Sequence, residues 1–553
     1  MNYSNLRQKM DFSIIAAFIC LLGFSLRIFM ISRQSIWFDE AASLVSAIQP
    51  SLTAVIKTTI ITERIPPLYP VFLHFWIKEF GFSEASIRFP SVIFGTLTVP
   101  LLYLFVKKFI NFKIAVISSL LLAVSPIHIY FSQEARYVCV FIFLNLFSTI
   151  LFYGMLKKES KIKFRDSCFY VFITCLAMYT NYLMVLSLFG QNIIYLLHNR
   201  INKVKMGIWI KGQFAIFLLC FLPLTFFLTS QVISVSQENS QDREKINLNL
   251  NYSQTTEPEK AMNKEDNFSN SKVNALLGIV RSRIKFQFLS TLKMGFFHAP
   301  FFLGSGIRYL NRVPYDWSPI FLNIVIIPST LLFLALFLLG WLVCIKKNEL
   351  YIVLLFFMPF TFILLIKLLG LRPIGVRHIA FLLPIFYLMI TLALFNIEKK
   401  IIRFICSMLL VFFIVLSLSI YYFDQKTYKD DWRYLTSYVL KDLTADDYIL
   451  FQGEYAHVPF RYYTKLLKKN NKNLAQNKIY SNTLQSADGS LERFLADKDK
   501  GELKNKKRIW LISYYALEEE NQRLKTYFDG QYNCVEKNTN LGRNLSLLLY
   551  TAK

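Results

Sequence analysis

Long apolar runs recur along the chain and are separated by short polar loops. Most have roughly 18 or more residues, about the length an α-helix needs to cross the ~30 Å hydrocarbon layer of a bilayer. We therefore expect a polytopic α-helical membrane protein with about eleven transmembrane helices. They lie near residues 12–31, 87–106, 114–131, 137–156, 167–180, 182–197, 208–229, 319–345, 350–369, 376–395 and 402–422. The first run contains Arg27 and has no cleavage site after it, so we expect it to be retained rather than removed as a signal peptide.

Composition and charge support this interpretation. Hydrophobic residues make up 54% of the 553 residues and charged residues only 18%, yet the net charge is +26. Most basic residues cluster in alternate loops, as the positive-inside rule predicts for cytoplasmic loops. The charge is therefore a topology signal, and we do not expect binding to nucleic acid. The N-terminus is then inside and the C-terminus outside. The clusters are Arg7 with Lys9, Lys107 with Lys108 and Lys113, Lys157 to Arg165, Arg200 to Lys211, Lys346 with Lys347, and Lys399 to Arg403.

Three regions outside the apolar runs complete the expected organisation. The first outer loop, residues 32–86, has apolar residues at every fourth position from Leu44 to Ile60, with Pro50 as a break. This spacing and the apolar segment starting at Leu68 predict interfacial helices. The outer loop 231–318 begins with a polar stretch. We expect a transmembrane domain over 1–423 and a small extracytoplasmic α/β accessory domain over 424–553, where strand-like runs such as "DYILFQG", "RIWLISYY" and "LSLLLYTA" alternate with helical ones.

Ionisable residues gather at the predicted outer ends of the helices, where such residues usually mark function. Each also has a structural explanation. Asp39 and Glu40 could equally cap the helix that follows them. Glu134 and Arg136 could be anchoring groups at a helix end, and His128 a local hydrogen-bonding residue. The four outer clusters are Asp39 with Glu40, Glu63 with Arg64, His128 with Glu134 and Arg136, and Arg372 with Arg377 and His378.

The motifs in these clusters resemble a known family. They are "WFDEA", "PPLYPVFLHFW" with "GFSEASIRFPS", "SPIHIYFSQEARY" and "RPIGVRHIAFLLP". Together they resemble the GT-C fold glycosyltransferases that use polyprenyl-phosphate sugars, in the bacterial branch related to protein O-mannosyltransferases and undecaprenyl-phosphate aminoarabinose transferase. The resemblance implies transfer of a sugar to an acceptor hydroxyl of a lipid, glycan or protein, with inversion, on the outer face of the plasma membrane.

The resemblance also implies roles for residues. Asp39 would be the catalytic base, with Glu40 as its neighbour in the motif. The leaving lipid phosphate needs cations, for which the candidates are Arg64, Arg136, Arg372, Arg377 and His378, with Arg27 as a further candidate from within the first run. Glu63 and Glu134 would be supporting acids. Some relatives use a divalent metal; Glu63, Glu134, His298 or His378 could supply ligands, although no spacing here requires one.

Two other functions remain open at this stage. A transporter or flippase of lipid-linked sugars would also be polytopic and basic on the inside, but such folds often contain internal repeats, and none is evident here. A membrane anchor for the C-terminal domain would not need so many helices. Seven of the eight cysteines lie in apolar runs, with spacings that suggest packing rather than a zinc site or disulfides.

Overall fold

The computed structural model describes residues 3–63, 65–158, 162–198, 203–221, 223, 225, 327–347, 349–368, 375–423, 429–444, 447–453, 456–470, 481–484, 506–514, 518–538, 541 and 545–553. The predicted outer loop 231–318 lies outside these residues. Contacts divide the chain into two units. We call residues 1–29, 65–69 and 89–424 the helical unit, and residues 30–64, 70–88 and 425–553 the α/β unit. The first outer loop thus belongs mostly to the same unit as the C-terminal segment.

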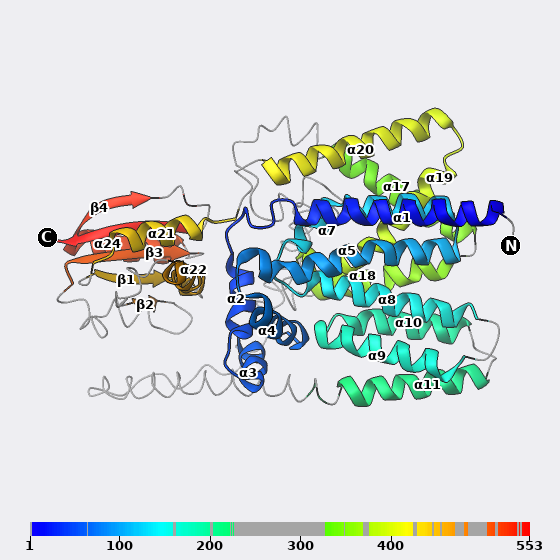
Figure 1. The fold of residues 1–553 in the computed structure, drawn as a ribbon, viewed down its shortest axis with the longest axis horizontal. Coiled ribbons are helices and arrows are strands. Elements are labelled where there is room, and N and C mark those ends of the chain that lie inside the picture. Colours follow the sequence, from blue (N-terminus) through cyan, green and yellow to red (C-terminus); the bar gives the residue numbers. More distant parts are fainter. Residues whose placement is uncertain are drawn as a thin grey trace, which may run out of the picture. The chain divides into compact units, whose positions relative to one another are not determined.

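The helices of the helical unit lie side by side with roughly parallel axes (Figure 1). A helix occurs within each of the predicted apolar runs, although several are shorter than expected. The helix α5, which starts at Glu84, has its first residues in the α/β unit. The helices are α1 (Tyr3–Ile28), α5 (Glu84–Phe109), α6 (Phe112–Ala123), α7 (Pro126–Ser132), α8 (Val138–Leu156), α9 (Phe164–Thr180), α10 (Met184–His198), α11 (Lys203–Ile216), which continues as a π-helix (Phe217–Phe221), α17 (Ile327–Lys346), α18 (Leu350–Leu368), α19 (Leu383–Asn396) and α20 (Lys400–Phe423).

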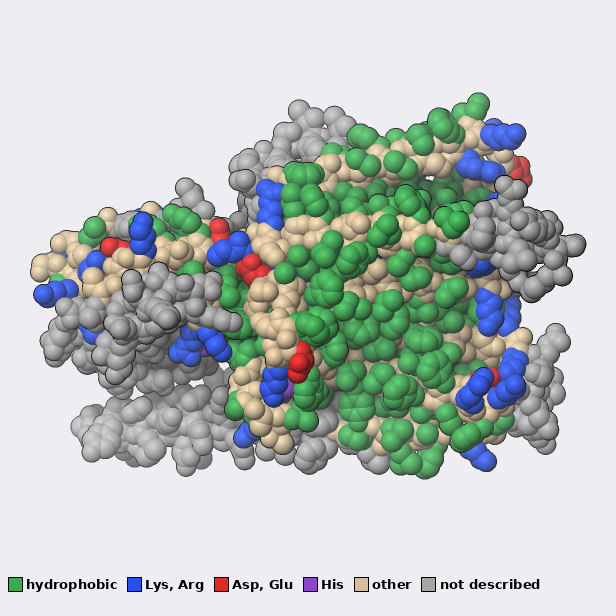
Figure 2. Space-filling view, viewed as in Figure 1, with side chains coloured by type: hydrophobic (Ala, Val, Ile, Leu, Met, Phe, Trp, Pro, Cys, Tyr) green, Lys and Arg blue, Asp and Glu red, His purple; other side chains and the backbone are tan. Residues whose placement is uncertain are grey.

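Several of these helices are suited to a membrane. Among the described residues, α5, α8, α17 and α20 are each long and apolar enough to cross one, and the bent pair α6 and α7 could make a fifth span. Hydrophobic side chains cover much of the visible side of the helical unit, and Lys and Arg gather at one end of its helices (Figure 2). The fold therefore fits a polytopic membrane protein. The number of eleven spans remains a prediction.

The run predicted as one helix over 114–131 is broken. α6 ends at Ala123, α7 begins at Pro126, and the two helices are bent by 57°. The side chain of Ser125 caps α7 by accepting a hydrogen bond from the backbone N–H of His128 at 3.3 Å. Proline suits the first helical position because it lacks the N–H that would have no partner there. Ser-Pro therefore starts a new helix inside an otherwise continuous apolar run.

The first outer loop forms three short helices: α2 (Phe38–Ala47), α3 (Leu52–Thr62) and α4 (Leu68–Phe80). As predicted, the periodic stretch is interrupted near Pro50, and Ser51 caps the second helix. The apolar stripe is only partly covered by protein. Leu44 is buried, whereas Ile48 is 51% exposed.

The C-terminal segment contains a five-stranded sheet of order β2-β1-β3-β5-β4. β1 runs parallel to β2 and β3, whereas β5 is antiparallel to β3 and β4. The three strand-like runs of the sequence form β1, β3 and β5. The strands are β1 (Asp447–Gln452), β2 (Ser481–Leu484), β3 (Arg508–Tyr514), β4 (Tyr532–Asn538) and β5 (Leu545–Ala552), and the described helices here are α21 (Trp432–Asp442), α22 (His457–Asn470) and α24 (Glu518–Gln531).

Apolar packing holds this sheet to its helices. Leu524 and Phe528 of α24 are fully buried and pack against alternate residues of the central strands, including Leu511. Alternation of this kind is expected of strands that bury one face against a helix. The strands β1 and β3 are thereby buried on one face against α24 in the α/β unit.

Candidate functional site

The opening acidic motif lies at the start of α2. Trp37 is the N-cap residue with an extended backbone, and Phe38 is the first helical residue. Asp39 is half-buried, whereas Glu40 is completely buried. The carboxylate of Glu40 accepts a hydrogen bond from the backbone N–H of Trp37 at 3.4 Å. Glu40 therefore has the capping role that is favourable for an acid in the first turn of a helix.

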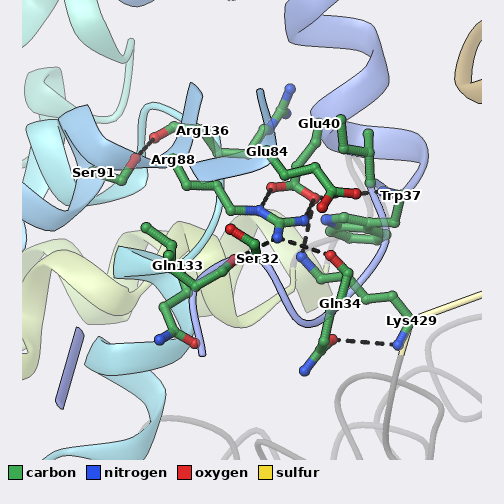
Figure 3. A network of polar contacts seen from close by, with 12 residues as sticks. Ser32, Gln34, Trp37, Glu40, Glu84, Arg88, Ser91, Gln133, Arg136 and Lys429 are labelled. Atoms are coloured by element: carbon green, nitrogen blue, oxygen red, sulfur yellow. Dashed lines mark hydrogen bonds and ion pairs between the residues drawn. The ribbon is translucent and has the colours of Figure 1, made fainter. Parts of the chain in front are cut away.

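Two cations neutralise Glu40 within the α/β unit (Figure 3). Arg88 donates from Nε to Oε1 at 2.7 Å and from Nη2 to Oε2 at 2.9 Å. Lys429 Nζ lies 3.2 Å from Oε2 and is itself buried. Such enclosure is tolerated because burying a carboxylate is costly unless it is paired and hydrogen-bonded.

The remaining donors of Arg88 hold the turn before α2. Nη1 donates to the backbone carbonyls of Ile31 and Gln34 at 2.7 and 2.9 Å, and Nη2 donates to that of Ser35 at 3.2 Å. All five N–H donors of the guanidinium are therefore used. Arg88 fixes both the carboxylate of Glu40 and the backbone that precedes it.

A second ion group lies in the same unit. Glu84, the first residue of α5, accepts hydrogen bonds from Arg433 of α21 and from the phenol of Tyr463 of α22. Arg433 also donates to the backbone carbonyl of Ser32 at 2.7 Å. Burial and, next, the charge of Glu84 raise the pKa of Tyr463 above its usual range, so the phenol stays protonated and can donate.

Glu63 also lies in the α/β unit, at the C-terminal end of α3. Its Oε2 accepts a hydrogen bond from the hydroxyl of Ser43 at 3.0 Å, which connects it to α2. Asp39, Glu40 and Glu63 are thus brought into one unit and onto two neighbouring helices. The candidates Arg64 and Arg372 lie outside the described residues.

The other candidates belong to the helical unit. Glu134 and Arg136 lie in the short segment that connects α7 to α8, and both are buried. The guanidinium of Arg136 lies 5.4 Å from the ring centre of Tyr137. The hydroxyl of Ser91 donates to the backbone carbonyl of Arg136 at 3.1 Å (Figure 3).

Arg377 and His378 of the helical unit are half-buried on the single 3₁₀ turn η3 (Val376–His378). The ring nitrogen Nδ1 of His378 accepts the backbone N–H of Gly375 at 2.9 Å. This bond holds the imidazole against the turn that also carries Arg377.

Arg27 is enclosed by protein in the helical unit. It donates to the carbonyls of Gly23, Leu122 and Ala123, at 2.7, 3.3 and 2.9 Å, and Nη2 lies 2.8 Å from Nδ1 of His128. Because arginine can only donate, Nδ1 of His128 accepts, and the neutral ring carries its proton on Nε2. Arg27 thus binds the C-terminal end of α6, where carbonyls have no partners within the helix. His128 has the local hydrogen-bonding role expected of it.

The donor set for a divalent metal is not assembled in the part of the chain that the structure describes. No group of three His, Cys, Asp or Glu side chains able to hold an ion occurs there. Glu63 is engaged by Ser43, and His298 lies outside the described residues. The described residues therefore do not fit a metal centre.

Five residues of the ion groups escaped prediction from the sequence: Glu84, Arg88, Lys429, Arg433 and Tyr463. One signal was available in the motif "GFSEASIRFPS". Glu84 and Arg88 are four residues apart at the start of a helix, where acidic and basic residues share a face. The C-terminal residues carry no comparable local signal.

Comparisons with known proteins support the resemblance seen in the motifs. A family model described as dolichyl-phosphate-mannose-protein mannosyltransferase matches residues 64–227. Residues 64–227 therefore resemble this family of glycosyltransferases. The membrane fold and the motifs agree with this relationship, so the resemblance is confirmed at the level of the glycosyltransferase type. No curated protein matches the chain significantly.

Solved structures are similar to this chain at low sequence identity. The oligosaccharyltransferase of Archaeoglobus fulgidus, tethered with an acceptor peptide, has a TM-score of 0.51 and 10% identity, over 99% of this chain and 74% of that one. ArnT from Cupriavidus metallidurans in the apo state has a TM-score of 0.49 and 9% identity, over 99% of this chain and 98% of that one. At this identity, the likeness to the oligosaccharyltransferase shows the fold alone.

Proposed function

We propose that this GT-C protein transfers a sugar from a polyprenyl-phosphate donor to an acceptor hydroxyl of a lipid, glycan or protein, with inversion at the anomeric carbon. The family match supports a lipid-phosphate-linked donor, because the matching model is described by a dolichyl-phosphate sugar. The basic loops support an active site on the outer face of the plasma membrane, since the acidic motifs fall in the opposite loops.

The contrast between Asp39 and Glu40 carries the assignment of the base. Glu40 is wholly buried and accepts from two cations, so it cannot meet a substrate. Asp39 follows the same N-cap residue on the same helical turn but is only partly buried. In the proposed step Asp39 takes the proton of the acceptor hydroxyl as its oxygen bonds to the anomeric carbon, and the bond from that carbon to the phosphate oxygen breaks. Glu40 acts as a positioning residue.

The leaving polyprenyl phosphate requires cations at the membrane surface. We assign this role to Arg64, Arg136, Arg372, Arg377 and His378, because a guanidinium can bind two phosphate oxygens at once. Glu63 and Glu134 would orient these basic residues and the acceptor. The C-terminal domain and the first outer loop would together present the acceptor side.

A reconstituted transfer assay tests this function. Purified protein in lipid nanodiscs is given radiolabelled polyprenyl-phosphate sugars and candidate acceptors, with wild type beside Asp39→Asn. We expect transfer by wild type and a loss of about 10²-fold or more in the variant, the usual range for a removed general base. Asp431→Asn is the matched control, since Asp431 is an exposed acid of the same unit and asparagine can replace it as the cap of α21.

Two results would contradict the proposal. Transfer by a folded Asp39→Asn variant at the wild-type rate would exclude Asp39 as the base. Movement of lipid-linked sugar across proteoliposomes, with no transfer to any acceptor, would favour the flippase alternative instead.

A further inference from the structure

Three consecutive backbone amides lead into Asp39, and each has a specific acceptor. The N–H of Ile36 donates to the phenol oxygen of Tyr463 at 2.8 Å, and that of Phe38 donates to Tyr514 at 3.3 Å. The amide between them, of Trp37, donates to Glu40 at 3.4 Å. Two of these three acceptors come from the C-terminal segment, although the residues they hold lie more than 400 positions earlier.

The two tyrosines are themselves fixed. Tyr514 is the last residue of the central strand β3 and is fully buried, with its ring 4.9 Å from that of Trp432. Tyr463 is fully buried on α22, where it also donates to Glu84 and accepts from the hydroxyl of Ser35 at 3.1 Å. The phenol oxygens are therefore presented from a sheet and a packed helix rather than from mobile loops.

Lys429 adds a third connection from the C-terminal segment. Its ammonium group lies 3.2 Å from Oε2 of Glu40 and 5.3 Å from the ring centre of Trp37. Its backbone N–H donates to the side-chain carbonyl of Gln34 at 3.3 Å. Lys429 thus contacts the turn on both sides of the residues that the tyrosines hold (Figure 3).

We propose that the C-terminal segment is an integral part of the active site, in which Tyr463, Tyr514 and Lys429 are positioning residues that hold the residue 34–40 turn and thereby orient Asp39. This inference rests on the proposed function for the role of Asp39. In this proposal the C-terminal segment is not a separate accessory domain. Its side chains position the catalytic base, which lies near the other end of the chain.

The physical reason is the sensitivity of proton transfer to geometry. A helix N-terminus leaves backbone N–H groups without intrahelical partners, so the first turn frays unless other groups bind it. A displacement of about 1 Å at a reacting group can cost a factor of about 10² in rate. Hydrogen bonds from well-packed neighbouring residues prevent such displacement.

Hydroxyl-deletion variants test the proposal. Tyr514→Phe and Tyr463→Phe remove the acceptors of the Phe38 and Ile36 amides and keep both rings. Tyr550→Phe is the matched control, because Tyr550 lies on β5 of the same sheet and its hydroxyl donates to Asp529 of α24 at 3.2 Å rather than accepting from the turn. Hydrogen exchange of peptides covering residues 34–40 and steady-state kinetics are measured for each protein in nanodiscs.

We expect exchange in residues 34–40 to accelerate about five- to tenfold in the two test variants and not in the control, as for the loss of one net hydrogen bond. We expect kcat to fall about tenfold while KM for the donor changes less than about twofold, because positioning rather than binding is lost. Lys429→Met should lower kcat similarly, and Lys429→Arg should restore most of it because the cation is kept.

The outcomes separate this inference from the proposed function. Unchanged exchange and kcat in the tyrosine variants and in Lys429→Met, with Asp39→Asn inactive, would overturn the positioning role and leave the function standing. Accelerated exchange together with full activity of Asp39→Asn would show that the turn is held as described but that Asp39 is not the base. If Tyr550→Phe lost as much kcat as Tyr463→Phe and Tyr514→Phe, the losses would reflect a general decrease in stability, and this would contradict the proposal.

Discussion

Arg88 holds Glu40 in a two-point contact, with Nε bonded to Oε1 at 2.7 Å and Nη2 bonded to Oε2 at 2.9 Å, and both side chains are almost completely buried. This parallel geometry is the strongest form of a charge-assisted pair. It connects the start of α5 to the start of α2. The neighbouring residue Asp39 therefore stands on a turn whose orientation depends on a residue 49 positions later in the chain.

Replacing Arg88 with lysine should destabilise the α/β unit. Lysine keeps the charge but presents donors from a single point, so it cannot bind both oxygens of Glu40 and the three carbonyls at once. Breaking a buried pair typically costs about 3–5 kcal/mol, and retention of the charge should reduce this to about 2–3 kcal/mol. Thermal unfolding in detergent, followed by intrinsic fluorescence, measures the loss.

Arg508→Lys is the control for this variant. Arg508 pairs with Asp442, whose side chain is 60% exposed, and its Nε also lies 3.5 Å from the buried Asp447; the Arg508 side chain itself is 24% exposed. Because one partner is exposed and the contact to Asp447 is long, we expect a loss of about 1 kcal/mol or less, smaller than that for the Arg88 variant. Equal shifts of the melting temperature in the Arg88 and Arg508 variants would contradict a special role for the Arg88 contact.

The sequence predicted most of the helices because their signal is local. Apolar runs and four-residue periodicity depend only on neighbouring residues, and they placed α2, α3 and the break near Pro50. The ion groups could not be found in this way. Lys429 and Glu40 are 389 positions apart, and no local pattern records such a pairing.

Two features of the sequence carry more information about the site and the fold than the apolar pattern alone. Glu40, Leu44 and Ala47 share the buried face of α2, so the spacing that predicted the helix also placed Glu40 inward. Ser125 before Pro126 is a start signal for a helix, and it divides the run that was predicted as one. In both cases the prediction followed the apolar pattern of the whole segment, although a single residue indicated the detail that the structure shows.

Acidification should destabilise the α/β unit through His457. Burial and, next, the charge of Arg461 lower its pKa to about 4, from about 6.5 when unfolded. The unfolded chain therefore binds more protons between these values, and stability falls as pH decreases from about 6.5 to about 4. Because His457 is only partly buried, we expect a contribution of about 1 kcal/mol.

Melting temperatures of wild type and His457→Gln over this pH range isolate the effect from that of the carboxyl groups. The melting temperature of wild type should decrease relative to that of the variant as pH decreases, because the variant has no imidazole to protonate. A constant difference across the range would exclude His457 as the source.

A close helix contact in the helical unit gives a prediction about packing. A Cβ added at Gly340 of α17 would lie 2.0 Å from the backbone carbonyl oxygen of Met389 in α19. A backbone atom cannot rotate away, so Gly340→Ala should force the two helices apart and cost about 1–3 kcal/mol. Thermal unfolding in detergent checks this loss.

Gly207→Ala in α11 is the matched control. Nothing lies within 4 Å of a Cβ at Gly207, so this change should be neutral or stabilise by up to about 1 kcal/mol through helix propensity. Similar melting temperatures for the two variants would contradict a tight contact between α17 and α19.

The proposed phosphate role of Arg136 and Arg377 predicts a selective defect. Replacing either residue with alanine should raise KM for the polyprenyl-phosphate donor about tenfold or more, because a charge-assisted hydrogen bond to phosphate contributes about 1.5–3 kcal/mol. KM for the acceptor should change little. Arg403→Ala is the control, since Arg403 donates to the backbone carbonyl of Ile397 beside α20 and belongs to a basic cluster predicted to be cytoplasmic. Kinetics with each substrate varied in turn measure both constants, and a larger effect on the acceptor than on the donor would assign these arginines to the other substrate.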